Sequence, residues 1–179
     1  MRGERDVEPF APQGLEVFCR KEWPRLVGLL VLLTGDRDVA QELAQETLVR
    51  VCRDAARVLS MDAPGPWAHR VAVNLANSHL RRLRSGRNAR SRMALERAPV
   101  GDPEPADAIA VRAALASLSQ RQRSAIVLRY YDDLPVREIA AALSCPEGTV
   151  KTLLQDSIAV LRRQGLIGSE FEEGVSNGT

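Results

Sequence analysis

The segment "LSCPEGTVKTLLQD", from Leu143 to Asp156, decides the fold of the C-terminal half of the chain. A helical pattern of apolar residues ends where the segment begins, Pro146 and Gly148 interrupt the chain, and a second helical pattern follows. The second pattern repeats every three or four residues, at Val150, Leu154, Ile158 and Leu161. Two short helices joined by such a turn form a helix-turn-helix, which places the start of its second helix in the major groove of DNA.

The outward face of this second helix determines what it can contact. Its small and polar residues are Gly148, Thr149, Lys151, Thr152 and Gln155. The side chains of Lys151 and Thr152 can bond phosphates or base edges, and Gln155 can hold an adenine through two hydrogen bonds. An ordinary helical hairpin with a solvated face has the same pattern, so both interpretations stay open for this segment alone.

The N-terminal half shows helical patterns as well. The first runs from Leu15 to Leu33, and Pro24 is expected to kink or restart it. The second runs from Val39 to Leu59 and has an apolar stripe that includes Cys52. The opposite, polar face of this helix is either a solvated surface or a docking face for a protein partner, and it consists of Gln41, Glu42, Gln45 and Glu46.

A third helix is expected to begin at Pro66 and to lead into a strongly basic segment. Six arginines and no acidic residue lie between Arg81 and Arg92, a pattern that favours binding to a phosphate backbone through counterion release. The helix before this segment offers groups that stack on bases or hydrogen-bond to them, namely Trp67, Asn74, Asn77 and Ser78. The alternative is a solvated basic face with Trp67 in the core.

No strand pattern occurs, and 45% hydrophobic residues with only 4% aromatic residues are typical of packed helices. We therefore predict an all-α protein with two small helical domains, residues 15–95 and 108–164, the second ending in the helix-turn-helix. The prolines of "APVGDPEPAD" make residues 96–107 a proline-rich linker, across which the two halves are expected to move independently. Residues 1–14 and 165–179 are predicted to be a flexible N-terminus and a flexible tail.

The sequence gives no sign of a catalytic or metal site. The three cysteines lie far apart and are expected to be buried thiols, and His69 and His79 lack metal-ligand spacing. We therefore predict that the protein is no enzyme and holds no metal or cofactor. The apolar run from Leu26 to Leu33 is too short to cross a membrane, and the N-terminus is unlike a signal peptide, so we expect a cytoplasmic protein.

Three segments, in this order, resemble the extracytoplasmic-function (ECF) sigma factors of the sigma-70 family. "DRDVAQELAQETLVRVCRD" is similar to region 2.2, "PWAHRVAVNLANSHLRR" to regions 2.3 and 2.4, and "ALASLSQRQRSAIVLRYYDDLPVREIAAALSCPEGTVKTLL" to region 4. The resemblance implies a bacterial sigma factor that directs core RNA polymerase to specific promoters and helps to melt the minus-10 element. The partners it implies are the clamp helices and flap of core RNA polymerase, promoter DNA and, where one exists, an anti-sigma factor.

The resemblance also implies roles for residues of this chain. Contacts to the minus-10 element fall on Trp67, Arg70, Asn74, Asn77, Arg81 and Arg82. Among these, the residue placed nearest a flipped base is Asn74. Contacts to the minus-35 element fall on Gly148, Thr149, Lys151, Thr152 and Gln155. Contacts to the polymerase fall on Gln41, Glu42, Gln45 and Glu46.

One departure from the family pattern concerns the second helix of the helix-turn-helix. After "GTVK" the family usually continues with serine and several arginines, whereas this chain has Leu153, Asp156 and Ile158 where basic residues are expected. We therefore expect weak binding to the minus-35 element. The alternative is that Leu153 is buried and that Arg162 and Arg163 supply the basic contacts.

Two other functions compete with this one. A stand-alone helix-turn-helix regulator would explain residues 119–164, but it would leave the helix around Asn74 and the arginine run unused. An all-helical protein-interaction module or an enzyme is the third alternative, and no nucleophile, metal-ligand set or phosphate loop supports an enzyme.

Overall fold

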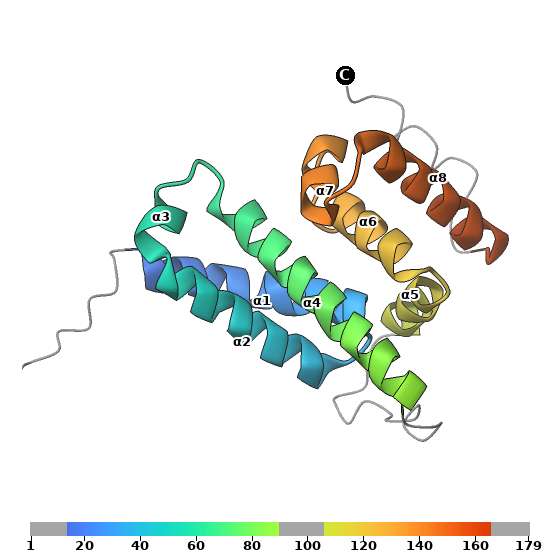
Figure 1. Ribbon diagram of the computed structural model, residues 1–179, viewed down its shortest axis with the longest axis horizontal. Helices are drawn as coiled ribbons and strands as arrows, with labels where there is room; N and C mark the ends of the chain where they lie inside the picture. Colours follow the sequence, from blue (N-terminus) through green and yellow to red (C-terminus); the bar gives the residue numbers. More distant parts are fainter. Residues whose placement is uncertain (1–13, 90–105, 166–179) are drawn as a thin grey trace, which may run out of the picture.

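The computed structural model describes residues 14–89 and 106–165, with side chains for residues 14–85 and 109–165. Within these ranges the chain forms eight α-helices and no strand, which confirms the all-α prediction (Figure 1). None of the described helices is long and apolar enough to cross a membrane. The helices are α1 (Leu15–Thr34), α2 (Arg37–Arg53), α3 (Ala55–Leu59), α4 (Pro64–Ala89), α5 (Ala106–Ala116), α6 (Gln120–Tyr130), α7 (Val136–Leu143) and α8 (Glu147–Arg163).

Helices α1 to α4 form the N-terminal half, and two local signals set the turn between the first two (Figure 1). Gly35 ends α1 in the left-handed conformation, with φ of 76°, and its N–H donates to the Val31 carbonyl. The Asp36 carboxylate then caps α2 by accepting from the backbone N–H groups of Asp38 and Val39, at 2.9 and 3.1 Å. The turn brings apolar residues of the two helices together in one core.

Several local expectations for this half are wrong. Pro24 does not restart the helix, because α1 is continuous from Leu15 to Thr34 and Pro24 lies on its exposed side. The second helix ends at Arg53, since Asp54 leaves the helical conformation with φ of −110° and ψ of 25°. Cys52 is exposed, because the buried stripe of α2 ends in Thr47 and Val51 and turns away from it.

Helices α5 to α8 form the C-terminal half and follow their sequence signals closely. Ser119 caps α6 in a capping box with Gln122. Pro135 precedes α7, and Pro146 precedes α8. Between them Ser144 adopts the left-handed conformation, with φ of 50°, and turns the chain from α7 into α8. The predicted helix-turn-helix is therefore confirmed as α7, a short turn and α8.

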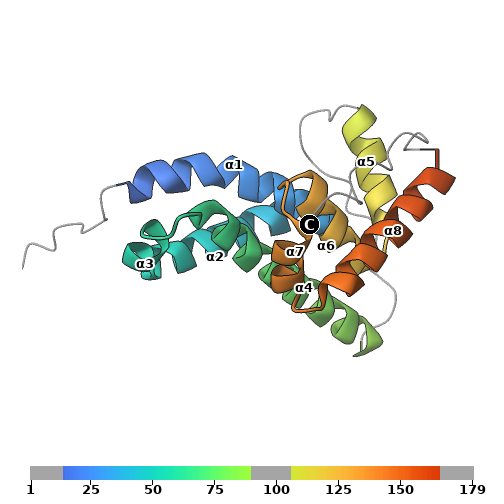
Figure 2. The same ribbon diagram turned by 90° about the horizontal axis from the view of Figure 1, so that it is seen from above.

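The two halves pack against each other (Figures 1 and 2). A single hydrophobic core contains residues from Leu26 in α1 to Leu161 in α8. The Arg123 guanidinium of α6 also donates to the Leu33 carbonyl at the end of α1, with an Nη1–O distance of 3.0 Å. The expectation that the halves move independently did not anticipate this shared core. Its physical cause is α6, which buries five consecutive residues, Ser124–Leu128, and is therefore covered on more than one side.

The predicted linker, residues 96–107, lies mostly outside the described residues, as do the predicted flexible ends at 1–14 and 165–179. Of the linker, only Ala106 and Asp107 are described, and they belong to α5. The domain boundaries therefore stay predictions.

Candidate nucleic-acid interface

Helix α8 presents the expected residues on its outward face. Its apolar stripe, Val150, Leu154, Ile158 and Leu161, is buried in the core. Gly148, Lys151, Thr152 and Gln155 are exposed, and Thr149 is half-buried. No side chain caps the start of α8, so the positive end of its dipole remains available to a phosphate. The Thr152 hydroxyl donates to the Gly148 carbonyl at 3.1 Å, so it offers a ligand mainly its acceptor lone pairs.

The unusual residues of α8 divide between core and surface. Leu153 is half-buried and packs against the hydrophobic core, so it is a packing residue rather than an exposed substitute for arginine. Asp156 is exposed on the same outward side as Lys151, Thr152 and Gln155. A negative charge therefore lies on the exposed face of α8, beside the residues expected to contact DNA.

Helix α4 carries the residues expected to contact the minus-10 element. Asn74 and Arg70 are exposed, as are Arg81 and Arg82. Trp67 is half-buried and packs against the second core cluster of the N-terminal half, which contains Leu15, Val51, Ala55, Val58 and Ala68. The Arg57 guanidinium lies over the indole ring, 5.4 Å from its centre, in a cation–π contact. Trp67 is thus anchored in the core with one face toward an arginine.

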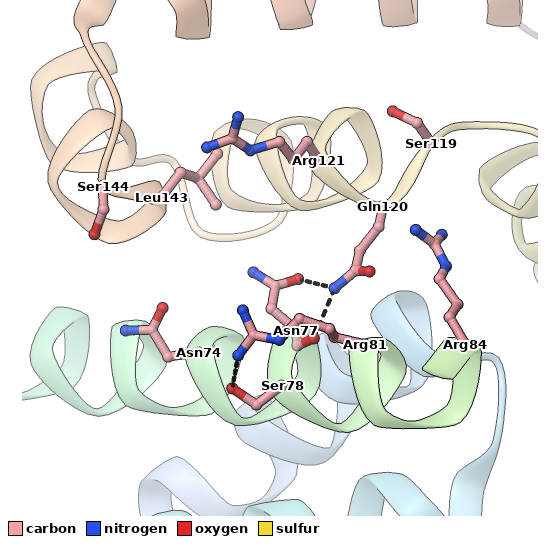
Figure 3. A pocket seen from close by; sticks show the side chains of 10 residues that line it. All are labelled: Asn74, Asn77, Ser78, Arg81, Arg84, Ser119, Gln120, Arg121, Leu143 and Ser144. Atoms are coloured by element: carbon pink, nitrogen blue, oxygen red, sulfur yellow. Dashed lines mark hydrogen bonds between the residues drawn. The ribbon is translucent and has the colours of Figure 1, made fainter. Parts of the chain in front are cut away.

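A pocket of about 780 Å³ opens between α4 and the start of α6 (Figure 3). Its volume lies in the range of about 300–1,000 Å³ that is usual for sites of small ligands. The residues that line it include three arginines and no carboxylate: Asn74, Asn77, Ser78, Arg81, Arg84, Ser119, Gln120, Arg121, Leu143 and Ser144. Such a lining suits a base together with its phosphate, since the arginines attract the anion and the amides can hydrogen-bond to the base.

Positive charge accumulates at the edge of this pocket. Burial, and after it the nearby charge of Arg84, lowers the pKa of the Arg123 guanidinium from its ordinary value. The guanidinium is nevertheless well bonded, because it donates to the carbonyls of Leu33, Leu115 and Ala116. A polyanion bound along α4 would neutralise the charges of the individual arginines. It would also reduce the repulsion between Arg84 of α4 and Arg123 of α6.

Asn77 differs from Asn74 in that its side-chain oxygen already accepts hydrogen bonds. The Gln120 Nε2 group donates to the Asn77 Oδ1 atom at 2.8 Å and to the Asn77 backbone carbonyl at 3.0 Å. The Ser124 hydroxyl donates to the same Oδ1 atom at 3.1 Å. Sequence reasoning missed both partners, although a buried serine inside the apolar run "SAIVL" was a usable signal, since buried hydroxyls require a partner.

The polar face of α2 is exposed as expected. Gln41, Glu42, Gln45 and Glu46 all lie on the surface. Glu46 forms an exposed ion pair with Arg50 at 2.7 Å, one helical turn further on. Such a pair contributes little to stability, so this face can take part in an interface at small cost to the fold.

Together these features define a two-part, all-helical protein with a helix-turn-helix, exposed arginines on α4 and a separate exposed polar face on α2. Comparison with known proteins agrees: the family model for Sigma-70 region 2 matches residues 19–86, and that for Sigma-70, region 4 matches residues 108–159. The matches fall in both halves, whereas a stand-alone helix-turn-helix regulator would account only for the second. No comparison favours that alternative.

Similar curated proteins are themselves sigma factors. The ECF RNA polymerase sigma factor SigK of Mycolicibacterium vanbaalenii is 31% identical over 176 residues, which cover 89% of this chain and 83% of SigK. The RNA polymerase sigma-H factor of Pseudomonas aeruginosa is 29% identical over 155 residues, covering 78% of this chain and 80% of that protein. The chain belongs to the ECF sigma factors of the sigma-70 family, and it is an RNA polymerase sigma factor.

A solved structure shares the fold. In the co-crystal of the sigma factor RpoE with the anti-sigma factor NepR from Bartonella quintana, RpoE aligns with a TM-score of 0.64 at 22% identity. The alignment covers 83% of this chain and 96% of RpoE. At this identity the likeness establishes the all-helical sigma fold alone.

Proposed function

We propose that α4 reads the minus-10 element of promoters and helps to melt it. Asn74 receives an unstacked base, while Arg70, Arg81 and Arg82 hold neighbouring phosphates. The observation that carries this proposal is the exposed Asn74 amide on the rim of a basic pocket of about 780 Å³. Trp67 supports this region from the core, because its ring packs against core residues instead of being available to stack on a base.

The helix-turn-helix has a supplementary role in this proposal. Gly148, Thr149, Lys151, Thr152 and Gln155 contact the minus-35 element, with the start of α8 facing the major groove. Exposed Asp156 lies among these groups and opposes a nearby phosphate. Specificity therefore rests mainly on the minus-10 side.

The exposed face of α2 completes the proposal as the docking site for the clamp helices of core RNA polymerase. Gln41, Glu42, Gln45 and Glu46 are available there, because α2 buries its opposite side in the core. The flap of the polymerase is the second contact, with the C-terminal half. We propose a cytoplasmic initiation factor without catalytic activity of its own. Because the Bartonella RpoE is held by NepR, an anti-sigma factor is proposed as a further partner.

Reversing charge on α2 tests the polymerase contact. The variant Glu42→Lys with Glu46→Lys should lose most of its affinity for core RNA polymerase in a pull-down with purified subunits, since two attractive or neutral contacts become repulsive. Glu16→Lys is the matched control, because Glu16 forms an equivalent exposed ion pair with Arg20 on α1. Equal binding by the double variant and the natural chain, with unchanged helix content, would rule out this docking face.

Run-off transcription tests the function as a whole. Core polymerase supplied with this chain should initiate at promoters selected from a randomised library, and omission of the chain should abolish that initiation. A chain that binds DNA tightly but never core polymerase would contradict the proposal.

A further inference from the structure

A buried histidine joins two helices and the turn after a third, at a point that the proposed DNA contacts do not use. His69 of α4 lies between two carboxylates: its Nε2 atom is 3.0 Å from Glu22 Oε2, and its Nδ1 atom is 2.7 Å from Asp132 Oδ1. Glu22 belongs to α1, whereas Asp132 follows α6. The three side chains are only 5%, 4% and 2% exposed, in the order His69, Glu22, Asp132. The cluster therefore crosses from one half of the chain to the other.

The arrangement is a bridge rather than a metal or catalytic site. The two carboxylates contact opposite ring nitrogens, so the three groups do not converge on one point, and no metal-binding group of His, Cys, Asp or Glu occurs among the described residues. A histidine can donate from both ring nitrogens only as the imidazolium cation. The ring thus lies between the two carboxylates, one at each ring nitrogen, and burial of carboxylates demands such polar neighbours.

The two carboxylates are held unequally. Glu22 accepts a hydrogen bond from His69 and also has the Arg25 guanidinium at 4.0 Å. Asp132 contacts His69 closely enough for an ion pair, but neither of its buried oxygens receives a hydrogen bond of acceptable geometry. A buried carboxylate without a hydrogen-bond donor is costly, and solvation on opening would remove that cost. The contact of Asp132 with His69 is therefore the weaker half of the bridge, and it is the half that crosses from α4 to the turn after α6.

The residue before Asp132 is fitted to the same surface. The Tyr131 hydroxyl donates to the Arg25 carbonyl at 3.3 Å, and it lies where a side chain on Gly28 would be, so an added Cβ would overlap it. The turn after α6 is thus seated directly on α1. In this closed arrangement, defined as the packing of α6 and the following turn on α1 and α4, Gln120 also occupies Asn77.

We propose that Glu22, His69 and Asp132 form a charge latch that holds the two halves of the chain in the closed arrangement. Loss of the His69 ring leaves Glu22 and Asp132 buried without the polar group that lies between them, and the halves then separate so that Asp132 reaches water. Glu22 keeps Arg25 beside it and stays in the N-terminal half. Opening also frees Asn77 from Gln120. Any effect of this release on DNA binding rests on the proposed role of α4, whereas the latch itself does not.

A rescue experiment on the full chain tests the latch. A compact chain of this length has a radius of gyration of about 16 Å. In solution scattering, the radius of gyration of the His69→Leu variant should exceed that of the natural chain by several ångströms. Circular dichroism should show unchanged helix content. Adding Asp132→Leu should restore the compact dimensions, since an apolar cluster replaces the unpaired carboxylate. His79→Leu, the same change on the same helix, is the matched control and should remain compact.

The outcomes separate the latch from general damage and from the DNA proposal. A compact His69→Leu chain, or one that opens and is not closed again by Asp132→Leu, overturns the latch. If His69→Leu fails to fold, the same comparison is made with His69→Gln, alone and together with Asp132→Leu. Glutamine keeps a hydrogen-bond donor for one carboxylate. Binding of a single-stranded minus-10 oligonucleotide should rise several-fold in the opened variant. Opening without that rise would leave the latch standing and count against the assigned role of α4.

Discussion

Gln120 of α6 donates a hydrogen bond to Asn77 of α4, with 2.8 Å between the Gln120 Nε2 and Asn77 Oδ1 atoms. The two residues lie in different halves of the sigma factor, 43 positions apart. The bond links the half that carries the proposed minus-10 contacts to the half that carries the helix-turn-helix. In the closed arrangement the Asn77 Oδ1 atom therefore already accepts hydrogen bonds, while Asn74, three positions earlier, is exposed.

Removing Gln120 should take away two of the three hydrogen bonds that Asn77 accepts from side chains in the closed arrangement and make it more available to DNA. Gln120→Ala should raise the affinity of the full chain for a single-stranded minus-10 oligonucleotide about threefold to tenfold, because hydrogen bonds of this kind contribute about 0.5–1.5 kcal/mol each. Fluorescence anisotropy with a labelled oligonucleotide measures the change. The double variant Asn77→Ala with Gln120→Ala should show no such gain, and an equal gain in both variants would count against Asn77 as the freed group.

Signals that lie close together in the sequence predicted much of the fold. Ser119 caps α6, and Pro146 interrupts the chain directly before α8, because caps and prolines act within one helical turn. The exposed residues of α8 followed from the period of its apolar stripe in the same way. These features need no knowledge of what packs against the helix.

Features that depend on distant segments were not predicted. His69 was judged only by its distance from His79, yet its partners are Glu22, 47 positions earlier, and Asp132, 63 positions later. The burial of Ser124 and the contact between Gln120 and Asn77 depend in the same way on how α6 lies on α4. Single-sequence patterns give the period of each helix but not the identity of the surface that covers it.

Asn74→Ala should impair promoter melting more than initial binding. A pocket for an unstacked base acts only after the base pair opens, so open complexes should fall about tenfold while closed complexes change little. Permanganate footprinting of open complexes, together with mobility shifts at low temperature for closed ones, separates the two steps. Asn74→Asp, which keeps the size but adds a negative charge, should be worse than alanine. Equal losses at both steps would contradict base recognition by Asn74.

Arg81 and Arg82 should contribute affinity without sequence preference. Replacing each with alanine should reduce binding to all single-stranded sequences alike and should lower the slope of log affinity against log salt by about 0.7 per lost phosphate contact. Titrations at several salt concentrations measure the slope. Arg20→Ala is the control, because Arg20 is an exposed arginine on α1 that lies far from Arg81 and Arg82 in the sequence. A change in sequence preference with an unaltered slope would show that these arginines contact bases instead.

The cysteines should differ sharply in reactivity. Burial, then the charge of Cys52 and a hydrogen bond to it, raises the pKa of Cys19 to about 11. At pH 8 only about one Cys19 thiol in a thousand is then the reactive thiolate, whereas Cys52 is exposed. Iodoacetamide should modify Cys52 first, and the rate at Cys19 should rise about tenfold per pH unit up to pH 10. Mass spectrometry of tryptic peptides follows both sites, and similar rates in the folded chain would contradict the shift. In urea the difference should vanish.

The final prediction concerns the negative charge on α8. Asp156 is exposed one helical turn beyond Lys151 and Thr152, so in the proposed docking it lies near a phosphate of the minus-35 duplex. Asp156→Arg should increase affinity for that duplex about threefold to tenfold, because it removes a repulsion and adds a charged donor worth on the order of 1 kcal/mol or more. Asp156→Asn, which only removes the repulsion, should give a smaller gain. Glu16→Arg makes the same charge change on α1 and controls for general attraction to DNA. Leu153 offers no alternative contact, since it packs against the core. Tight minus-35 binding by the unaltered chain, or no gain from Asp156→Arg beyond that of Glu16→Arg, would remove Asp156 from the DNA-facing side of the helix.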